Sequence, residues 1–153
     1  MTEASISERI QAEMTKAMKE KDAETLSTVR MLKAALMEAK TAKPKDAGLT
    51  REEEIEILQR YVKKRRETIE INTKAGRADL NASEDREIAV TQRFLPAMLS
   101  EAKLKEIVEA AVASTGAAGP KDMGKVIGAV MAQVKGQAEG GTVSKLVKAA
   151  LGG

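Results

Sequence analysis

The stretch TREEEIEILQRYVKKRRETIEI, residues 50–71, predicts the longest helix of the sequence and, with it, the fold class. Thr50 and Glu53 have the spacing of a capping box, which marks the start of a helix. The inward-facing side chains occupy two neighbouring flanks, one with Ile55, Leu58, Val62 and Ile69 and the other with Ile57, Tyr61, Thr68 and Ile71. A face this wide is expected to contact two other helices, which indicates a helical bundle.

The composition favours the same class. Hydrophobic residues make up 42% of the chain but aromatic residues only 1%, so the core must consist of Leu, Ile, Val, Ala and Met. Ala and Met pack closely between helices, whereas sheets favour aromatic and β-branched residues. We therefore expect an all-α protein.

Capping and turn residues divide the rest of the chain into further helices. The expected starts before Pro96 are Ser5 or Ser7, Asp22, Thr50 and Asn81, with a loop around Pro44 and Gly48. After Pro96, helices are expected from Ser100, over residues 122–135 and over residues 142–151. The sequence thus predicts an N-terminal bundle of about four helices in residues 1–96, followed by a small three-helix domain in residues 97–153.

Several kinds of chemistry are excluded by composition. The chain has no cysteine and no histidine, which removes disulfides, thiolate zinc sites, a cysteine nucleophile and a histidine general base. The polar N-terminus differs from a signal peptide, and no apolar run approaches the roughly 20 residues of a bilayer span. We expect a soluble cytoplasmic protein with no metal, no cofactor and no membrane contact.

The net charge of +3 is concentrated near the C-terminus. Residues 116–153 carry five lysines against Asp122 and Glu139, so this quarter of the chain accounts for the whole excess. Such an asymmetry suggests an anionic partner. The run KKRR, residues 63–66, is interpreted instead as a solvated, salt-bridged outer face, because six glutamates share its helix.

The stretch DMGKVIGAVMAQVKG, residues 122–136, predicts an amphipathic helix with two unexpected glycines. On an ideal helix the apolar seam contains Met123, Val126, Ile127, Val130 and Val134. The opposite side contains Lys121, Lys125, Gly128, Ala132 and Lys135, with Gly124 on the shoulder. Each glycine costs the helix roughly 0.5–1 kcal/mol relative to alanine.

Two interpretations of these glycines remain open. In the first, missing side chains let an RNA backbone approach, while the lysines supply charge and Lys145 and Lys148 add to it from the next helix. The turn KGQAEGG, residues 135–141, leaves backbone N–H groups free for anions. In the second, the Gly-x-x-x-Gly spacing of Gly124 and Gly128 permits close packing between helices.

Several motifs resemble the YqeY-like family. They are DMGKVIG at 122–128, VKGQAEGG at 134–141, VRMLKAAL at 29–36, AGRADL at 75–80 and RFLPAMLSEAKL at 93–104, in the family's order. The family shares its C-terminal domain with the tail of the B subunit of the tRNA-dependent Asp/Glu amidotransferase. Gln137 departs from the family pattern, which commonly has arginine there, a bidentate phosphate binder.

The resemblance implies a tRNA-binding role for the C-terminal domain, because the amidotransferase tail helps to hold the outer corner of tRNA. The expected RNA-binding residues are Lys121, Gly124, Lys125, Gly128, Lys135, Gly136, Lys145 and Lys148. Carbon–nitrogen ligase activity would belong to the larger enzyme, since this chain lacks a Cys–His pair, a Ser–Ser–Lys pattern and a phosphate loop. The alternative is a protein adaptor that docks on a synthetase or amidotransferase subunit without direct RNA contact.

Overall fold

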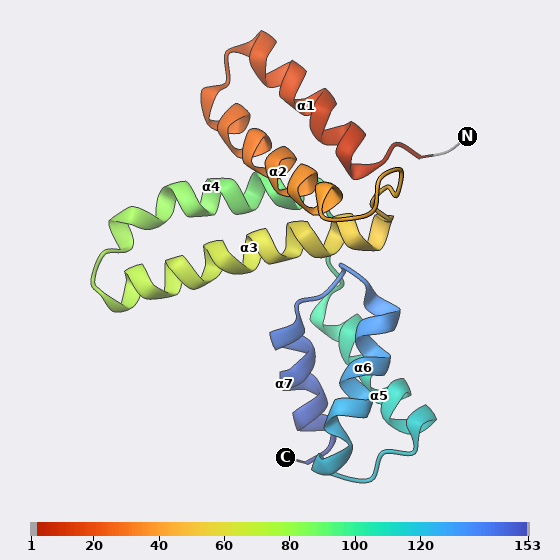
Figure 1. The fold of residues 1–153 in the computed structure, drawn as a ribbon. Coiled ribbons are helices and arrows are strands. Elements are labelled where there is room, and N and C mark those ends of the chain that lie inside the picture. Colours follow the sequence, from red (N-terminus) through yellow and green to blue (C-terminus); the bar gives the residue numbers. More distant parts are fainter. Residues whose placement is uncertain (1–2, 153) are drawn as a thin grey trace. The chain divides into compact units, whose positions relative to one another are not determined.

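The computed structural model describes residues 3–152, and this part of the chain is helical without strands (Figure 1). The predicted all-α class is confirmed. The α-helices are α1 (Ile6–Glu20), α2 (Ala23–Thr41), α3 (Arg51–Lys74), α4 (Asn81–Gln92), α5 (Glu101–Thr115), α6 (Met123–Val134) and α7 (Gly140–Ala150). Two short 3-10 helices, η1 (Ala78–Leu80) and η2 (Pro120–Asp122), precede α4 and α6. The chain divides into two compact units, residues 1–95 and 96–153.

Helix α3 organises the N-terminal unit. The predicted capping box is present: the Glu53 N–H donates to the Thr50 hydroxyl at 3.1 Å, and the Thr50 N–H donates to the Glu53 carboxylate at 2.8 Å. The wide apolar face contacts three helices, α1, α2 and α4, rather than the two expected. Helices α3 and α4 lie side by side as a hairpin, and Gly76, with φ of +73°, turns the chain between them (Figure 1).

The basic run in α3 is divided between two environments. Lys63, Lys64 and Arg66 are exposed, as expected for an outer face. Arg65 departs from that expectation: its guanidinium lies 4.8 Å from the ring centre of Tyr61. Its Nη1 atom is also 3.5 Å from Glu84 and 3.7 Å from Glu87 of α4. Arg65 follows Tyr61 by about one helical turn and therefore shares its inward side.

Two contacts tie α1 to the rest of the N-terminal unit. Glu54 is only 4% exposed, and its carboxylate accepts hydrogen bonds from the Ser7 N–H, at 2.8 Å, and from the Ser7 hydroxyl. Arg9 donates to the main-chain carbonyls of Arg93, at 2.8 Å, and Phe94, at 3.4 Å. A buried carboxylate thus meets the start of α1, and a cation meets the end of α4, both favourable with respect to the helix dipole.

The start of α4 differs from the prediction. Asn81 is the first residue of α4 rather than its cap, and the preceding Leu80 makes no side-chain capping bond. The Asn81 side chain instead accepts from the Asn72 amide at 3.0 Å and donates to the Thr73 hydroxyl at 3.1 Å. A partner across the hairpin therefore displaces the local capping interaction.

The C-terminal unit is a three-helix arrangement of α5, α6 and α7 around an aliphatic core (Figure 1). Residues Leu104, Val108, Val126, Val130, Val134, Val143 and Val147 are each at most 2% exposed. Ser100 caps α5, since its hydroxyl accepts from the Lys103 N–H at 3.1 Å, as the sequence predicts. Helix α7 begins at Gly140, two residues before the expected start, because Val143 already donates to the carbonyl of Glu139 at 3.1 Å.

Candidate nucleic-acid interface

One side of α6 is buried and the other faces solvent, as the spacing predicts. Val126, Val130 and Val134 are at most 1% exposed. The other side exposes Gly124, Lys125, Gly128, Ala129, Ala132 and Gln133. Apart from Lys125 and Gln133, these residues have at most a methyl side chain, so the outer surface of the helix is smooth.

The two glycines of α6 do not serve packing within the C-terminal unit. A Cβ atom added to Gly124 or to Gly128 would meet nothing within 4 Å. Neither residue has the positive φ that would itself demand glycine. The interpretation of the two glycines as a helix-packing motif inside the C-terminal unit is therefore wrong, and no residue of that unit covers them.

Five lysines of the C-terminal unit lie on α6 and α7 or beside them. Lys121, Lys125, Lys135, Lys145 and Lys148 are all exposed. Helices α6 and α7 contain no acidic residue. Within residues 3–152, no carboxylate forms an ion pair with Lys121, Lys125, Lys145 or Lys148. We use the name basic face for a set of exposed residues in this unit. It consists of Lys121, Lys125, Lys135, Lys145 and Lys148, together with the small residues Gly124, Gly128, Ala129 and Ala132 of α6.

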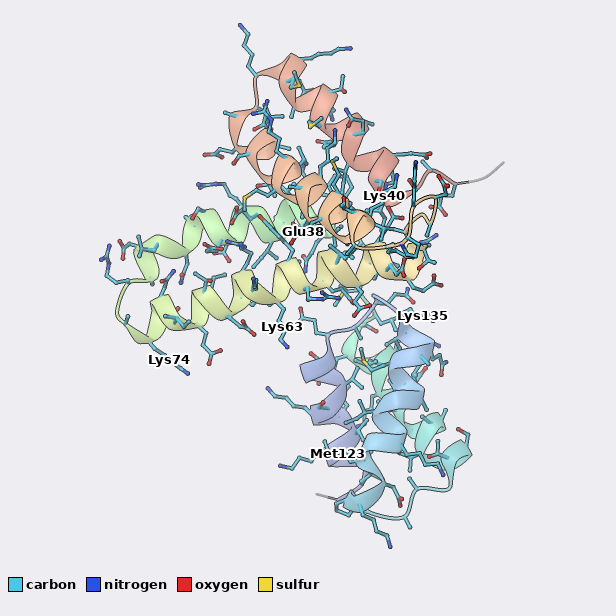
Figure 2. The ribbon with its side chains drawn as sticks, viewed as in Figure 1. Glu38, Lys40, Lys63, Lys74, Met123 and Lys135 are labelled. Atoms are coloured by element: carbon cyan, nitrogen blue, oxygen red, sulfur yellow. The ribbon has the colours of Figure 1, made fainter. Side chains whose placement is uncertain are left out.

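Helix α5 provides the contrast within the same unit. Its two lysines lie among three glutamates, and Lys103 lies 3.5 Å from Glu106. The positive charge that no acidic residue of the same helix offsets therefore lies on α6 and α7. Figure 2 shows Met123 and Lys135 near opposite ends of α6, and Lys121 precedes Met123 in the sequence, so lysines flank both ends of the helix.

We call the turn of residues 135–139 the site turn. It does not place Gly136 on the surface, where the sequence predicts an RNA contact. Gly136 has φ of +79° and is buried, so it offers no surface to RNA. The left-handed residue closes the end of α6 and folds the chain inward. The turn is also less open than expected, because the Gln137 N–H donates to the Val134 carbonyl at 2.7 Å. The first N–H groups of α7 have no acceptor within the helix, and Glu139, which precedes it, makes no side-chain capping bond to them.

The N-terminal unit has a concave feature that the sequence did not indicate. It is a cleft of about 750 Å³ lined by α2 and α4 residues, with Arg65 of α3 among them. Next to it, the Tyr61 hydroxyl lies 3.2 Å from Glu87, and burial, followed by the Glu87 charge, raises the pKa of Tyr61 to about 12. This phenol therefore stays protonated near neutral pH, and Glu87, the carboxylate beside it, also lies 3.7 Å from Arg65.

Among the described residues there is neither a candidate metal site nor a candidate membrane span. No group of three or more acidic side chains within residues 3–152 is placed to hold a metal ion. Among the helices of those residues, none combines the length and apolar composition of a bilayer span.

The fold and surface define a class: an all-helical protein whose C-terminal three-helix unit combines an aliphatic core with an exposed lysine-rich face. The family model described as Yqey-like protein matches residues 7–151, and the chain belongs to this family. The chain is also similar to Altered inheritance of mitochondria protein 41, mitochondrial, of Pyrenophora tritici-repentis (strain Pt-1C-BFP). The two are 31% identical over 151 residues, which cover 94% of this chain and 80% of that relative. The family resemblance stated from the motifs is thus confirmed.

Proposed function

We propose that this protein is a non-catalytic tRNA-binding module and that the basic face of the C-terminal unit contacts the RNA. The observation that carries the proposal is the pairing of uncompensated lysines, such as Lys125, with an unobstructed helix surface. Lys125 lies one turn before the exposed Ala129 and beside Gly128, so charge and access coincide. Lysine charge attracts the phosphates, and the unobstructed surface lets the RNA backbone lie close to the helix.

The character of the face favours contacts to backbone and shape over base stacking. The C-terminal unit contains no aromatic residue, and Tyr61 and Phe94 of the N-terminal unit are 9% and 5% exposed. Proteins that bind single-stranded RNA generally stack bases on exposed aromatic rings. The proposed ligand is therefore a folded RNA such as the outer corner of tRNA, in keeping with the amidotransferase tail domain that the family resembles.

The absence of catalytic chemistry is part of the proposal. Several carboxylates of the N-terminal unit are engaged in caps and ion pairs, such as Glu53 with Lys43 at 2.8 Å and Glu54 with the N–H and hydroxyl of Ser7. Glu54 is 4% exposed, so its contact with the Ser7 hydroxyl supports a structural role rather than a reaction with a substrate. We infer that any amide-forming chemistry associated with such a module belongs to a partner enzyme, in a cytoplasmic translation context.

The test is fluorescence anisotropy of labelled tRNA with the full chain at about 50 and about 200 mM salt, a range over which phosphate contacts weaken strongly. The variant Lys125→Gln/Lys145→Gln removes two charges from the basic face. The control Lys103→Gln/Lys105→Gln removes the same charge from α5. Only the first variant should weaken binding, and its log–log salt slope should be shallower by about 0.9 for each phosphate that the variant no longer neutralises.

The competing function is a protein adaptor, and one observation favours it. The small residues at 128, 129 and 132 would equally admit a partner helix from a synthetase or amidotransferase subunit. Affinity for such a partner would depend weakly on salt, since it would come from packing rather than from counterion release. Equal tRNA binding by both charge variants, or none by the wild type, would favour the adaptor.

A further inference from the structure

The site turn is hydrogen-bonded to the segment through which the C-terminal unit is connected to the N-terminal unit. The Leu99 N–H donates to the Gln137 carbonyl at 2.8 Å. The Gln137 side-chain amide donates to the Ala97 carbonyl at 3.4 Å. We call residues 96–99 the linker segment. One residue of the site turn thus bonds to the linker segment at two points, from its main chain and from its side chain.

Burial anchors the bond to Leu99 at both of its ends, whereas the bond to Ala97 is exposed. Gly136 and Ala138, on either side of Gln137, are buried, with Ala138 only 3% exposed. Leu99 packs against the core of the C-terminal unit. Because close-packed interiors transmit displacement rather than absorb it, the site turn cannot shift without moving the end of the linker segment. Met98, between the two bonded linker residues, is 46% exposed and is not held in this way.

We propose that these two hydrogen bonds couple occupancy of the basic face to the order of the linker segment. Lys135 is the first residue of the site turn, so an RNA phosphate bound there restrains the turn, and the turn restrains residues 97–99 through Gln137. The inference rests on the proposed function, because it requires RNA at the basic face. Gln137 is then a positioning residue, and the coupling is a change in order that can be measured directly.

The experiment is ¹⁵N NMR relaxation of the full chain, free and with an RNA hairpin of about 12 base pairs, long enough to present a continuous A-form backbone. Leu99→Pro deletes the N–H that donates to Gln137. Leu99→Ala keeps that N–H and loses comparable packing, so it is the matched control. If Leu99→Pro unfolds the unit, Gln137→Ala, which deletes only the bond to Ala97, replaces it against wild type.

In wild type and in Leu99→Ala, hairpin RNA should raise the heteronuclear NOE of residues 97–99. In Leu99→Pro, RNA should still shift the resonances of α6 and α7, with affinity within about three-fold of the control, less than 1 kcal/mol. The NOE of residues 97 and 98 should then stay unchanged; residue 99 gives no signal in this variant, because proline has no N–H. An equal NOE response in both Leu99 variants overturns the inference and leaves the proposed function standing. No RNA-dependent shifts in wild type at low salt overturn both.

Discussion

Replacing Gly128 by alanine should stabilise the protein and weaken its RNA binding at the same time. Gly128 lies in the middle of α6, with helical backbone and open space around the added methyl group. Alanine in a helix interior is favoured over glycine by about 0.5–1 kcal/mol. For a cooperative unit of this size that difference raises the melting temperature by about 2–8 °C, measurable by scanning calorimetry of the full chain.

The same methyl group should obstruct an RNA backbone that approaches α6 closely. We expect tRNA affinity to fall about five-fold, or about 1 kcal/mol, in the anisotropy assay. The salt slope should stay unchanged, because Gly128→Ala removes no charge. Ala132→Gly, about one turn further along the same exposed side, is the reciprocal control: it should lower stability by a similar amount and leave binding intact.

The gain in melting temperature and the loss of tRNA affinity of Gly128→Ala can be tested independently. A lower melting temperature for Gly128→Ala would contradict the open space around that position. A stabilised variant with unchanged tRNA affinity would show that RNA, if bound, does not come close to Gly128. The second result would leave the charge of the basic face as the sole support for the proposed function.

Three further predictions concern the N-terminal unit. Glu54→Ala should lower the free energy of unfolding by about 2–3 kcal/mol in urea titrations, because it leaves the Ser7 N–H and hydroxyl without their buried acceptor. Arg9→Met should cost about 1–2 kcal/mol in the same assay, because two carbonyls at the end of α4 lose a charged donor. Tyr61, the only tyrosine, should titrate near 12 by ultraviolet absorbance. Because its folded pKa exceeds the unfolded value of 10.0, its contribution to stability is complete below about pH 10 and is lost as the pH rises toward 12.

Each of these three predictions has a control variant or an outcome that would contradict it. Glu56→Ala removes an exposed carboxylate, paired with Arg60 at 3.2 Å, from the same helix as Glu54 and should cost at most about 0.5 kcal/mol. An equal cost for Glu54 and Glu56 would contradict the buried capping role. Arg9→Lys keeps the charge but not the fork of donors, and full retention of stability there would reduce the Arg9 interaction to charge alone. A Tyr61 titration near 10 would show that the phenol is solvated.

Local chemistry made much of the fold predictable from sequence. The caps at Thr50 and Ser100 are bonds between a side chain and an N–H three residues later, so the residues themselves carry the signal. The exposed and buried sides of α6 follow from helical periodicity in the same way. These features depend on no partner elsewhere in the chain.

The errors arose where a distant partner competes with a local one. Asparagine is a residue type that commonly caps helices, but the Asn81 side chain forms hydrogen bonds across the hairpin to Asn72 and Thr73. Arg65 belongs to a basic run yet turns toward glutamates of α4. At the candidate site, the burial of Gly136 depends on how the site turn meets the linker segment, which spacing alone does not encode.

The basic face depends on the fold of the whole C-terminal unit and not on the sequence of α6 alone. Of the twelve residues of α6, six are glycine or β-branched: Gly124, Val126, Ile127, Gly128, Val130 and Val134. Such a segment is a poor helix former, and isolated helices of this length are marginal even in favourable sequences. The lysines are therefore aligned by the valine core shared with α5 and α7 rather than by α6 itself. A synthetic peptide of residues 122–136 should be a random coil in water, and grafting it onto another protein would transfer its charge without its surface.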